Sequence, residues 1–345
     1  TGPPVGPATR RPWAGGLVAI ALVLAVAGAA ALAPDGGPPI GRLSVAAVQG
    51  GGRRGVSKAQ VRPAAVFAAQ IDATHRMTRR HGGRAPALVL WPEDVVSVDG
   101  RLAGTPEAAM LSSLARRLRT TVVAGVTVTV PDLRFLNEAV AWGPAGHVAG
   151  AYEKVHRVPF GEYIPDRPFF AHFANLSAVP RDAVPGHGSG LLPTPAAPLG
   201  VMVSYEVFFA GRGRSAVRAG AHLLVVPTNT SSYTTSQVPS QEVAADRVQA
   251  VEEGRDLVQA APTGYSTVVR SDGTVAHRSG LGDRQVLLAT VALRAGPTPY
   301  ERWGDPPVLA LCVLLLASGI LGARAARGRA HGRRPNRGRG RAQRS

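Results

Sequence analysis

Three short segments carry the residue types that could perform a reaction, and each lies at or near the end of an apolar run. The first run, residues 88–91, leads into Pro92 and Glu93. A carboxylate just beyond a hydrophobic strand can lie in a partly dry pocket, where burial raises its pKa and makes it a useful base. A glutamate after a strand also fits an ordinary loop, so a role for Glu93 depends on partners elsewhere in the chain.

The second segment, residues 152–165, reads YEKVHRVPFGEYIP and contains Lys154 and Glu162. This mixture of charged side chains, aromatic side chains, prolines and a glycine is unusual for a plain surface loop. The third segment, residues 200–206, reads GVMVSYE and places the hydroxyl of Ser204 between a buried-type strand and a helix. A nucleophile at that point benefits from the positive end of the helix dipole.

Taken in order, these segments resemble the nitrilase, or carbon–nitrogen hydrolase, superfamily. The motifs that carry the resemblance are Trp91-Pro92-Glu93, Tyr152-x-Lys154, the Val-Pro-Phe-Gly-Glu-Tyr string of 158–163, and Tyr205-Glu206. The string of 158–163 joined to a terminal apolar segment is more narrowly similar to the apolipoprotein N-acyltransferases of bacterial membranes. Further matches lie at Pro227-Thr228-Asn229 and at residues 298–305, so the resemblance covers about residues 40–323.

The resemblance implies a four-layer α-β-β-α sandwich of the α/β class with a Glu–Lys–Cys triad. Glu93 takes the general-base position, and Lys154 takes the position that stabilises the oxyanion. Glu162 matches a second carboxylate near the centre. Four other residues match positions that support the site or bind substrate: Tyr205, Glu206, Asn229 and Tyr233.

The nucleophile position departs from the family, because Ser204 stands where the family has cysteine. The single cysteine, Cys312, lies in an apolar segment and cannot replace it. A serine hydroxyl is far less acidic than a thiol and needs a well-placed base during the attack. Three alternatives follow: a working serine acyltransferase, a slow one, or a catalytically silent homologue. A second departure is Ser232 and Tyr233, which stand where the family shows a Trp-Phe pair.

The reaction implied by the resemblance moves an acyl chain from a phospholipid to the nucleophile. The acyl chain then passes from the nucleophile to the N-terminal amine of S-diacylglyceryl-cysteine in a lipoprotein. The alternatives are a membrane-anchored amide hydrolase and a silent homologue that binds lipoproteins. We expect no cofactor and no metal, because the nine histidines are scattered without ligand spacing and a lone cysteine excludes a Cys cluster.

The elements that must position these residues alternate between strand and helix, which indicates an α/β domain. Strands are expected at 43–48, 87–91, 121–130, 137–142, 199–203, 222–226, 257–261, 267–270 and 285–291. Helices are expected at 57–80, 105–119, 207–219 and 238–254, the second of them capped by Thr105 with Pro106 at its first position. Residues 179–199 are expected to form a surface loop, and Asp246 to lie on a solvated helix face.

Two uncharged segments flank this domain and predict membrane spans. Residues 13–33 and 307–323 lack charged side chains, and the chain of 345 residues carries a net charge of +17. Nine arginines and no acid fall in 324–345, and Arg10 and Arg11 lie in the 1–12 flank. Positive flanks mark the cytoplasmic side, so the catalytic region 34–306 is expected outside the cytoplasmic membrane.

Two alternatives remain for these flanking segments. Residues 13–33 could instead be a cleaved signal peptide, although the apolar stretch is long for one. The arginine tail is interpreted as an anchor to anionic lipid, with no nucleic-acid partner. The family carries several spanning helices before its catalytic domain, so further helices are expected upstream, on this chain or on another.

Overall fold

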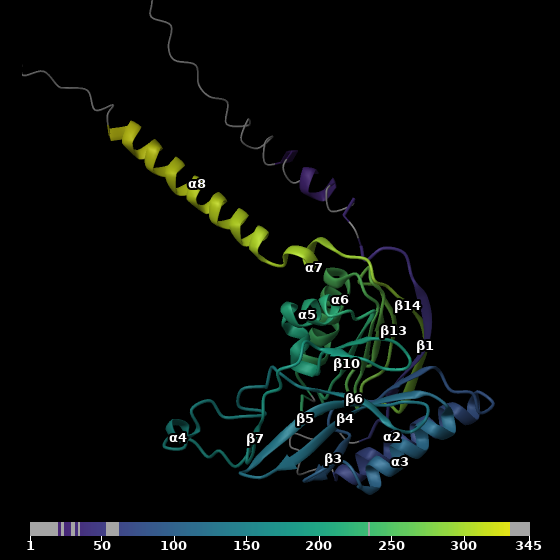
Figure 1. Cartoon of the computed structure of the whole chain (residues 1–345). Coiled ribbons are helices and arrows are strands. Elements are labelled where there is room, and N and C mark those ends of the chain that lie inside the picture. Colours follow the sequence, from purple (N-terminus) through teal and green to yellow (C-terminus); the bar gives the residue numbers. More distant parts are fainter. Residues whose placement is uncertain are drawn as a thin grey trace, which may run out of the picture. The chain divides into compact units, whose positions relative to one another are not determined.

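The chain divides into two compact units, Thr1–Arg302 and Trp303–Ser345. The computed structural model describes residues 20–21, 24–28, 32–33, 35–52, 62–233 and 235–331. Most of the first predicted span, 13–33, and the end of the arginine tail lie outside these residues. The first unit holds two β-sheets and the helices that cover them (Figure 1).

The larger sheet has eight strands and carries the first two chemical segments. Its main path is β14 (Gln285–Leu293), β1 (Gly41–Gln49), β2 (Leu88–Leu90), β4 (Thr121–Val130), β5 (Arg134–Trp142) and β6 (Val148–Glu153). Two further strands, β3 (Val96–Asp99) and β7 (Asp182–Ala183), pair with β4 and β5. β1, β2 and β4 run parallel, so their carboxyl ends lie at one edge of the sheet.

The smaller sheet has six strands and carries the third segment. Its order is β13 (Val275–Arg278), β12 (Thr267–Val269), β11 (Leu257–Ala260), β10 (Leu223–Pro227), β9 (Leu199–Val201) and β8 (Leu191–Leu192). β9, β10 and β11 are parallel and fully buried, as expected for short continuous apolar runs. Ser204 and Thr228 therefore follow neighbouring parallel strands at the same edge.

Helices cover the outer face of each sheet, so the expected four layers are present. α2 (Pro63–Arg80) and α3 (Pro106–Leu118) pack on the eight-stranded sheet, and α5 (Ala210–Arg218) and α6 (Val238–Glu253) pack on the six-stranded one (Figure 1). The predicted cap of α3 is confirmed, because Thr105 Oγ1 accepts a hydrogen bond from the Ala108 backbone N–H at 3.2 Å. Shorter helices are α4 (Arg167–Phe170), the 3-10 helix η2 (Ser204–Phe208) and α7 (Pro299–Trp303).

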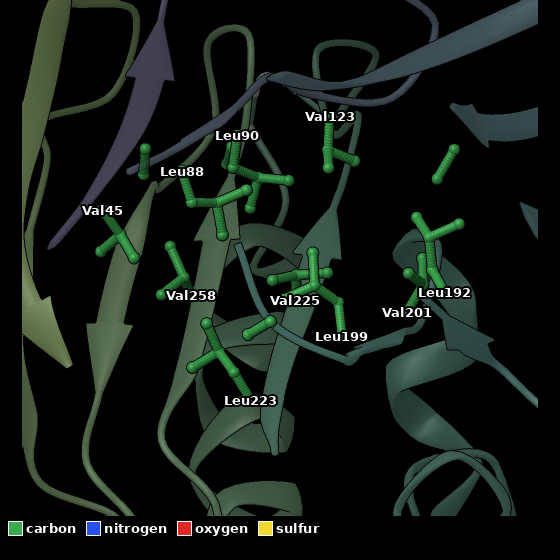
Figure 2. Packing of buried hydrophobic residues seen from close by; sticks show 14 of the residues in the cluster. Val45, Leu88, Leu90, Val123, Leu192, Leu199, Val201, Leu223, Val225 and Val258 are labelled. Atoms are coloured by element: carbon green, nitrogen blue, oxygen red, sulfur yellow. The ribbon is translucent and has the colours of Figure 1, made fainter. Parts of the chain in front are cut away.

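Alternating side chains divide the core into layers. Val45 and Leu88 from the larger sheet meet Leu223 and Val258 of the smaller sheet in the cluster between the sheets (Figure 2). Their neighbours in the sequence point the other way: Ala46 and Val89 pack in the cluster between the larger sheet and its helices. This period of two is the physical reason that the same Val-rich strands fill two cores.

Two expectations about exposure were wrong. Residues 179–199 contain β7 and β8, and Leu192 of β8 is fully buried against the core. Asp246 of α6 is also fully buried, and its Oδ2 accepts a hydrogen bond from Thr267 Oγ1 at 3.0 Å. The helix therefore turns an acidic side chain inward, where the hydroxyl of Thr267 partly compensates the lost hydration.

The second unit contains α8 (Pro306–His331). Many of its large apolar side chains are exposed, among them Val308, Leu311, Leu314 and Leu316. Among the described residues, however, no helix meets the length and apolarity required to cross a membrane. The two spans predicted at 13–33 and 307–323 therefore stay predictions.

Candidate active site

Glu93, Lys154 and Glu162 form one buried cluster at the end of the eight-stranded sheet. Lys154 Nζ donates to Oε1 of Glu93 at 2.9 Å and to Oε1 of Glu162 at 3.0 Å. The side chains of Lys154 and Glu93 are 2% and 5% exposed. The structure thus brings Glu93 together with Lys154 and Glu162, which come from a distant part of the sequence.

The backbone places two members of this cluster just beyond the end of a strand. Glu93 follows β2, and Lys154 directly follows β6. Gly125 of β4 allows the Glu93 turn to approach, because a Cβ at this position would lie 2.4 Å from the Cα of Glu93. The Gly125 backbone N–H donates to the Pro92 carbonyl at 3.0 Å, which fixes the turn against the sheet.

Asn137 joins the same cluster and was missed as a site residue. Its Nδ2 donates to Oε1 of Glu93 at 2.7 Å and to Oε1 of Glu162 at 2.8 Å. Asn137 lies on β5 at the same inward-facing alternation as Ala139 and Ala141, which line the core between the sheets. The sequence signal that could have identified Asn137 is a polar residue at a strand position that faces the core. Its amide holds the two carboxylates in one orientation.

Burial and charge act in opposite directions within this cluster. Burial raises the pKa of Glu93 to about 7, although the charge of Lys154 acts to lower it. Burial alone would lower the pKa of Lys154, but the charges of Glu93 and Glu162 outweigh it and hold that pKa above its ordinary value. Lys154 therefore stays a cation at neutral pH, and Glu93 can gain or lose a proton there.

Ser204 lies at the first position of η2, three residues after β9 ends at Val201. Its backbone φ is 49°, in the left-handed region that residues other than glycine rarely adopt. Strain of this kind is concentrated at functional sites, where the surrounding structure maintains it. The Oγ of Ser204 donates to Oε1 of Glu242 at 3.1 Å, and the side chain is buried.

Glu242 belongs to α6 and was also missed. Thr228 Oγ1 donates to the same Oε1 at 2.7 Å, and the Glu242 side chain is nearly inaccessible. The charges of Glu93 and Lys154 both act on the Glu242 carboxyl group. The Ser204 hydroxyl and the Lys154 cluster therefore belong to one electrostatic neighbourhood, made by the ends of strands from both sheets.

Glu206 is a structural carboxylate that connects the second and third segments. It accepts hydrogen bonds from the Tyr152 hydroxyl at 2.9 Å and from the backbone N–H groups of Val155, His156 and Val203 at 2.8, 3.0 and 2.9 Å. These contacts fix the strand that precedes Ser204 and the chain that follows Lys154. Glu206 thereby positions both groups relative to each other.

The other three predicted site residues contact residues that lie nearby in the sequence. Tyr205 packs edge-on against Phe209, with ring centroids 5.1 Å apart. Asn229 Oδ1 accepts from the Ser231 backbone N–H at 3.2 Å and from its hydroxyl at 2.7 Å, forming a turn after β10. Tyr233 is 41% exposed, and its backbone N–H donates to the carbonyl of Thr230. Roles for these three in binding substrate stay predictions.

Across residues 35–52, 62–233 and 235–331, no group of three or more His, Cys, Asp or Glu side chains is arranged to hold a metal ion. The chemistry available here is that of carboxylates, one buried ammonium group and a hydroxyl. Such a set can transfer protons and stabilise an oxyanion during attack on a carbonyl carbon.

The sequence matches the carbon–nitrogen hydrolase family over residues 44–299, which is most of the chain. The chain belongs to the carbon–nitrogen hydrolase family. The match spans all four layers and includes Glu93, Lys154 and Ser204. Solved structures agree on the fold: the Saccharomyces cerevisiae Nit3 protein of the nitrilase superfamily has a TM-score of 0.55 at 18% identity, covering 73% of this chain and 90% of its own. An amidase from a Nesterenkonia species has a TM-score of 0.51 at 21% identity, covering 76% and 92%.

Curated relatives of this carbon–nitrogen hydrolase family member are named as acyltransferases. The apolipoprotein N-acyltransferase of Geobacter metallireducens is 32% identical over 280 residues, covering 79% of this chain and 51% of the relative. That of Mycolicibacterium smegmatis is 30% identical over 280 residues, covering 79% and 47%. The chain therefore spans about half the length of the curated relatives it matches.

Proposed function

We propose that this chain is an N-acyltransferase that moves an acyl chain from a phospholipid to the N-terminal amine of an S-diacylglyceryl-cysteine lipoprotein. The observation that carries the proposal is the buried Lys154 that bridges Glu93 and Glu162, together with the strained Ser204. The match to curated apolipoprotein N-acyltransferases supports this choice of substrates over other carbonyl compounds.

The proposed reaction has two half-reactions. In the first, Ser204 Oγ attacks the ester carbonyl of the phospholipid, its proton passes to a carboxylate, and the lysophospholipid alcohol leaves with a proton. In the second, the lipoprotein amine attacks the acyl-serine ester, the C–Oγ bond breaks, and Ser204 recovers its proton. Lys154 stabilises the oxyanion in both halves, and Glu93 serves as the base that takes the amine proton.

We also propose that the protein is attached to the cytoplasmic membrane, with the catalytic domain on the outer side. The uncharged segments 13–33 and 307–323 and their arginine-rich flanks support this arrangement. Both substrates of the proposed reaction are lipids, so a site held close to the bilayer would meet them directly. Resistance to extraction by alkaline carbonate would test the attachment.

The function is tested by reconstituting the full chain in phospholipid vesicles with a synthetic diacylglyceryl-cysteine peptide. Because the relatives are longer, any encoded upstream helices are supplied as well. Mass spectrometry of the peptide measures the addition of one acyl chain. Native protein is compared with Ser204→Ala, Ser204→Cys and Lys154→Ala.

Acylation by native protein, and its loss in Ser204→Ala, would support a serine acyltransferase. Acylation by Ser204→Cys alone would contradict catalysis by the native chain and would favour a silent homologue that binds lipoproteins. Release of free fatty acid or cleavage of a small amide, without acylation of the peptide, would instead favour a hydrolase.

A further inference from the structure

The hydroxyl of Ser204 is paired with a carboxylate that belongs to neither of the two glutamates bound by Lys154. Ser204 Oγ donates to Glu242 Oε1 at 3.1 Å, and Thr228 Oγ1 donates to the same oxygen at 2.7 Å. Within the described part of the chain, the other oxygen, Oε2, is buried without a hydrogen-bond partner. Glu242 can therefore accept one more proton or hydrogen bond at the site.

Glu93 is already engaged by other donors. Its Oε1 accepts from Lys154 Nζ at 2.9 Å and from Asn137 Nδ2 at 2.7 Å. A carboxylate that neutralises a buried ammonium group is a poorer proton acceptor for a hydroxyl, because protonation would leave Lys154 less compensated. A second carboxylate in contact with the hydroxyl avoids this cost.

We propose that Glu242 is the general base for Ser204: it takes the hydroxyl proton during attack and returns a proton to the leaving group, while Thr228 holds its carboxylate in place. This inference rests on the proposed function, since it assumes that Ser204 is the nucleophile. In this proposal Glu242 of α6 activates the Ser204 hydroxyl, whereas Glu93 pairs with Lys154 and receives the proton of the amine.

The protons and bonds of the first half-reaction balance under this assignment. The Oγ–H bond breaks as the Oγ–C bond forms, and the proton moves to a Glu242 oxygen. Lys154 stabilises the negative charge on the carbonyl oxygen. When the tetrahedral intermediate collapses, the ester C–O bond breaks, and the protonated Glu242 donates its proton to the departing alcohol oxygen.

The electrostatic surroundings of Glu242 suit a base that works near neutral pH. Burial raises the pKa of Glu242 to about 7, while the hydrogen bonds from Thr228 and Ser204 act to lower it. Among charged groups, Glu93 acts to raise this pKa and Lys154 to lower it. Asp246, one turn along α6, is a further buried acid that interacts with Glu242. A base of this strength is partly ionised at pH 7, where it can both accept and donate a proton.

The test measures how fast a fluorophosphonate probe labels Ser204 in the full chain, in phospholipid, between pH 5.5 and 9. This probe needs no lipoprotein, so it reports on the nucleophile separately from the proposed acyl acceptor. We expect native labelling to increase with pH through about 7, and Glu242→Gln to label about 100-fold more slowly or worse. Glu242→Asp, which keeps a carboxylate, should recover part of the rate.

The matched control is Glu253→Gln, the same change at another fully buried glutamate of the same helix. It should label at the native rate. If Glu242→Gln fails to fold, Thr228→Val provides a second test. It removes a hydrogen bond that stabilises the ionised Glu242 carboxylate, so the midpoint of the labelling rate against pH should move to higher pH. A purely structural role for Thr228 would leave that midpoint unchanged.

The outcomes separate this inference from the proposed function. Labelling of Ser204 that is equally fast in folded Glu242→Gln, with an unshifted profile in Thr228→Val, would overturn the base assignment and leave the acyltransferase proposal standing. Acylation of the lipoprotein peptide that survives Ser204→Ala would overturn the role of Ser204 as nucleophile, and with it the base assignment. Labelling of Ser204 without any acylation of the peptide by native protein would instead overturn the proposed acyl acceptor and leave the base assignment standing.

Discussion

Lys154 Nζ lies 2.9 Å from Oε1 of Glu93, and both side chains are almost completely shielded from water. Glu162 contacts the same ammonium group from a second side at 3.0 Å. One cation thus compensates two buried carboxylates, and Asn137 supplies neutral donors to both. The cluster is a candidate catalytic site, and it also contributes to the stability of the fold. Removing the Lys154 ammonium group would leave the carboxylates of Glu93 and Glu162 buried next to each other without a cation.

Replacing Lys154 with methionine should therefore destabilise the fold as well as stop the reaction. Loss of one partner from a buried ion pair costs about 3–5 kcal/mol of unfolding free energy. The cost should be smaller at pH 5 than at pH 8, because burial raises the pKa of Glu93 to about 7 and its protonation removes its repulsion with Glu162. Urea unfolding at both pH values measures it, with Arg117→Met on the exposed face of α3 as control. Equal losses at the two pH values would contradict this account.

Gly125→Ala tests whether the Glu93 turn depends on close approach to β4. The new Cβ would meet Glu93 Cα at 2.4 Å and the Pro92 carbonyl oxygen at 2.5 Å. We expect about 1–3 kcal/mol of destabilisation from overpacking, and about a 100-fold loss of acyl transfer from misplacement of the carboxylate. Gly211→Ala on α5 is the control, because nothing lies within 4 Å of the position that its new Cβ would occupy. Native activity in Gly125→Ala would show that the approach is not needed.

Substitutions at Tyr152 and Glu206 test, in two steps of increasing severity, the hydrogen bonds that connect residues 152–165 with residues 200–206. Tyr152→Phe removes a hydroxyl that donates to the Glu206 carboxylate and accepts from Arg212 Nη2 at 2.8 Å, which should cost about 1.5–3 kcal/mol. Glu206→Gln should cost more, because the amide of glutamine directs N–H groups at backbone donors that now face a carboxylate. Thermal unfolding of the two variants gives the order. A Glu206→Gln protein as stable as Tyr152→Phe would argue against Glu206 as the connecting group.

The pH dependence of stability provides an independent measure of Glu242. Its pKa in the folded protein is about 7, above the value of 4.5 for an exposed glutamate. A raised pKa means that the folded state holds its proton more tightly, so stability should fall as pH rises from about 4.5 to 7. Glu242→Gln should remove up to about 3 kcal/mol of that decline. Identical slopes for native protein and Glu242→Gln would show that burial does not perturb this carboxyl group.

Much of the fold could be predicted because short Val-rich runs separated by turns are typical of buried strands. β4 matches its expected bounds, 121–130, and the cap of α3 follows from Thr105 and Pro106 alone. Glu93, Lys154 and Glu162 were predicted as site residues from their motifs, and the structure places them in contact. Their catalytic roles are still predictions.

The part that could not be predicted lies on α6. Its inward face is polar: Glu242, Asp246, Gln249 and Glu253 are all buried. Spacing of this kind ordinarily marks a solvated face, so Asp246 was misplaced and Glu242 was overlooked. Only the folded structure shows the hydroxyl groups of Thr228, Ser204 and Thr267 that oppose these acids. Those partners come from distant parts of the chain, which helix periodicity cannot reveal.

The most direct test of the central claim is to trap the acyl-enzyme. The full chain would be incubated with phospholipid in the absence of any amine acceptor, digested and analysed by mass spectrometry. We predict a peptide containing Ser204 that is heavier by one acyl chain, that is absent from Ser204→Ala, and that loses the added mass when the diacylglyceryl-cysteine peptide is supplied. Acyl transfer to the peptide without any acylated Ser204 intermediate, or with the acyl chain on another residue, would contradict it.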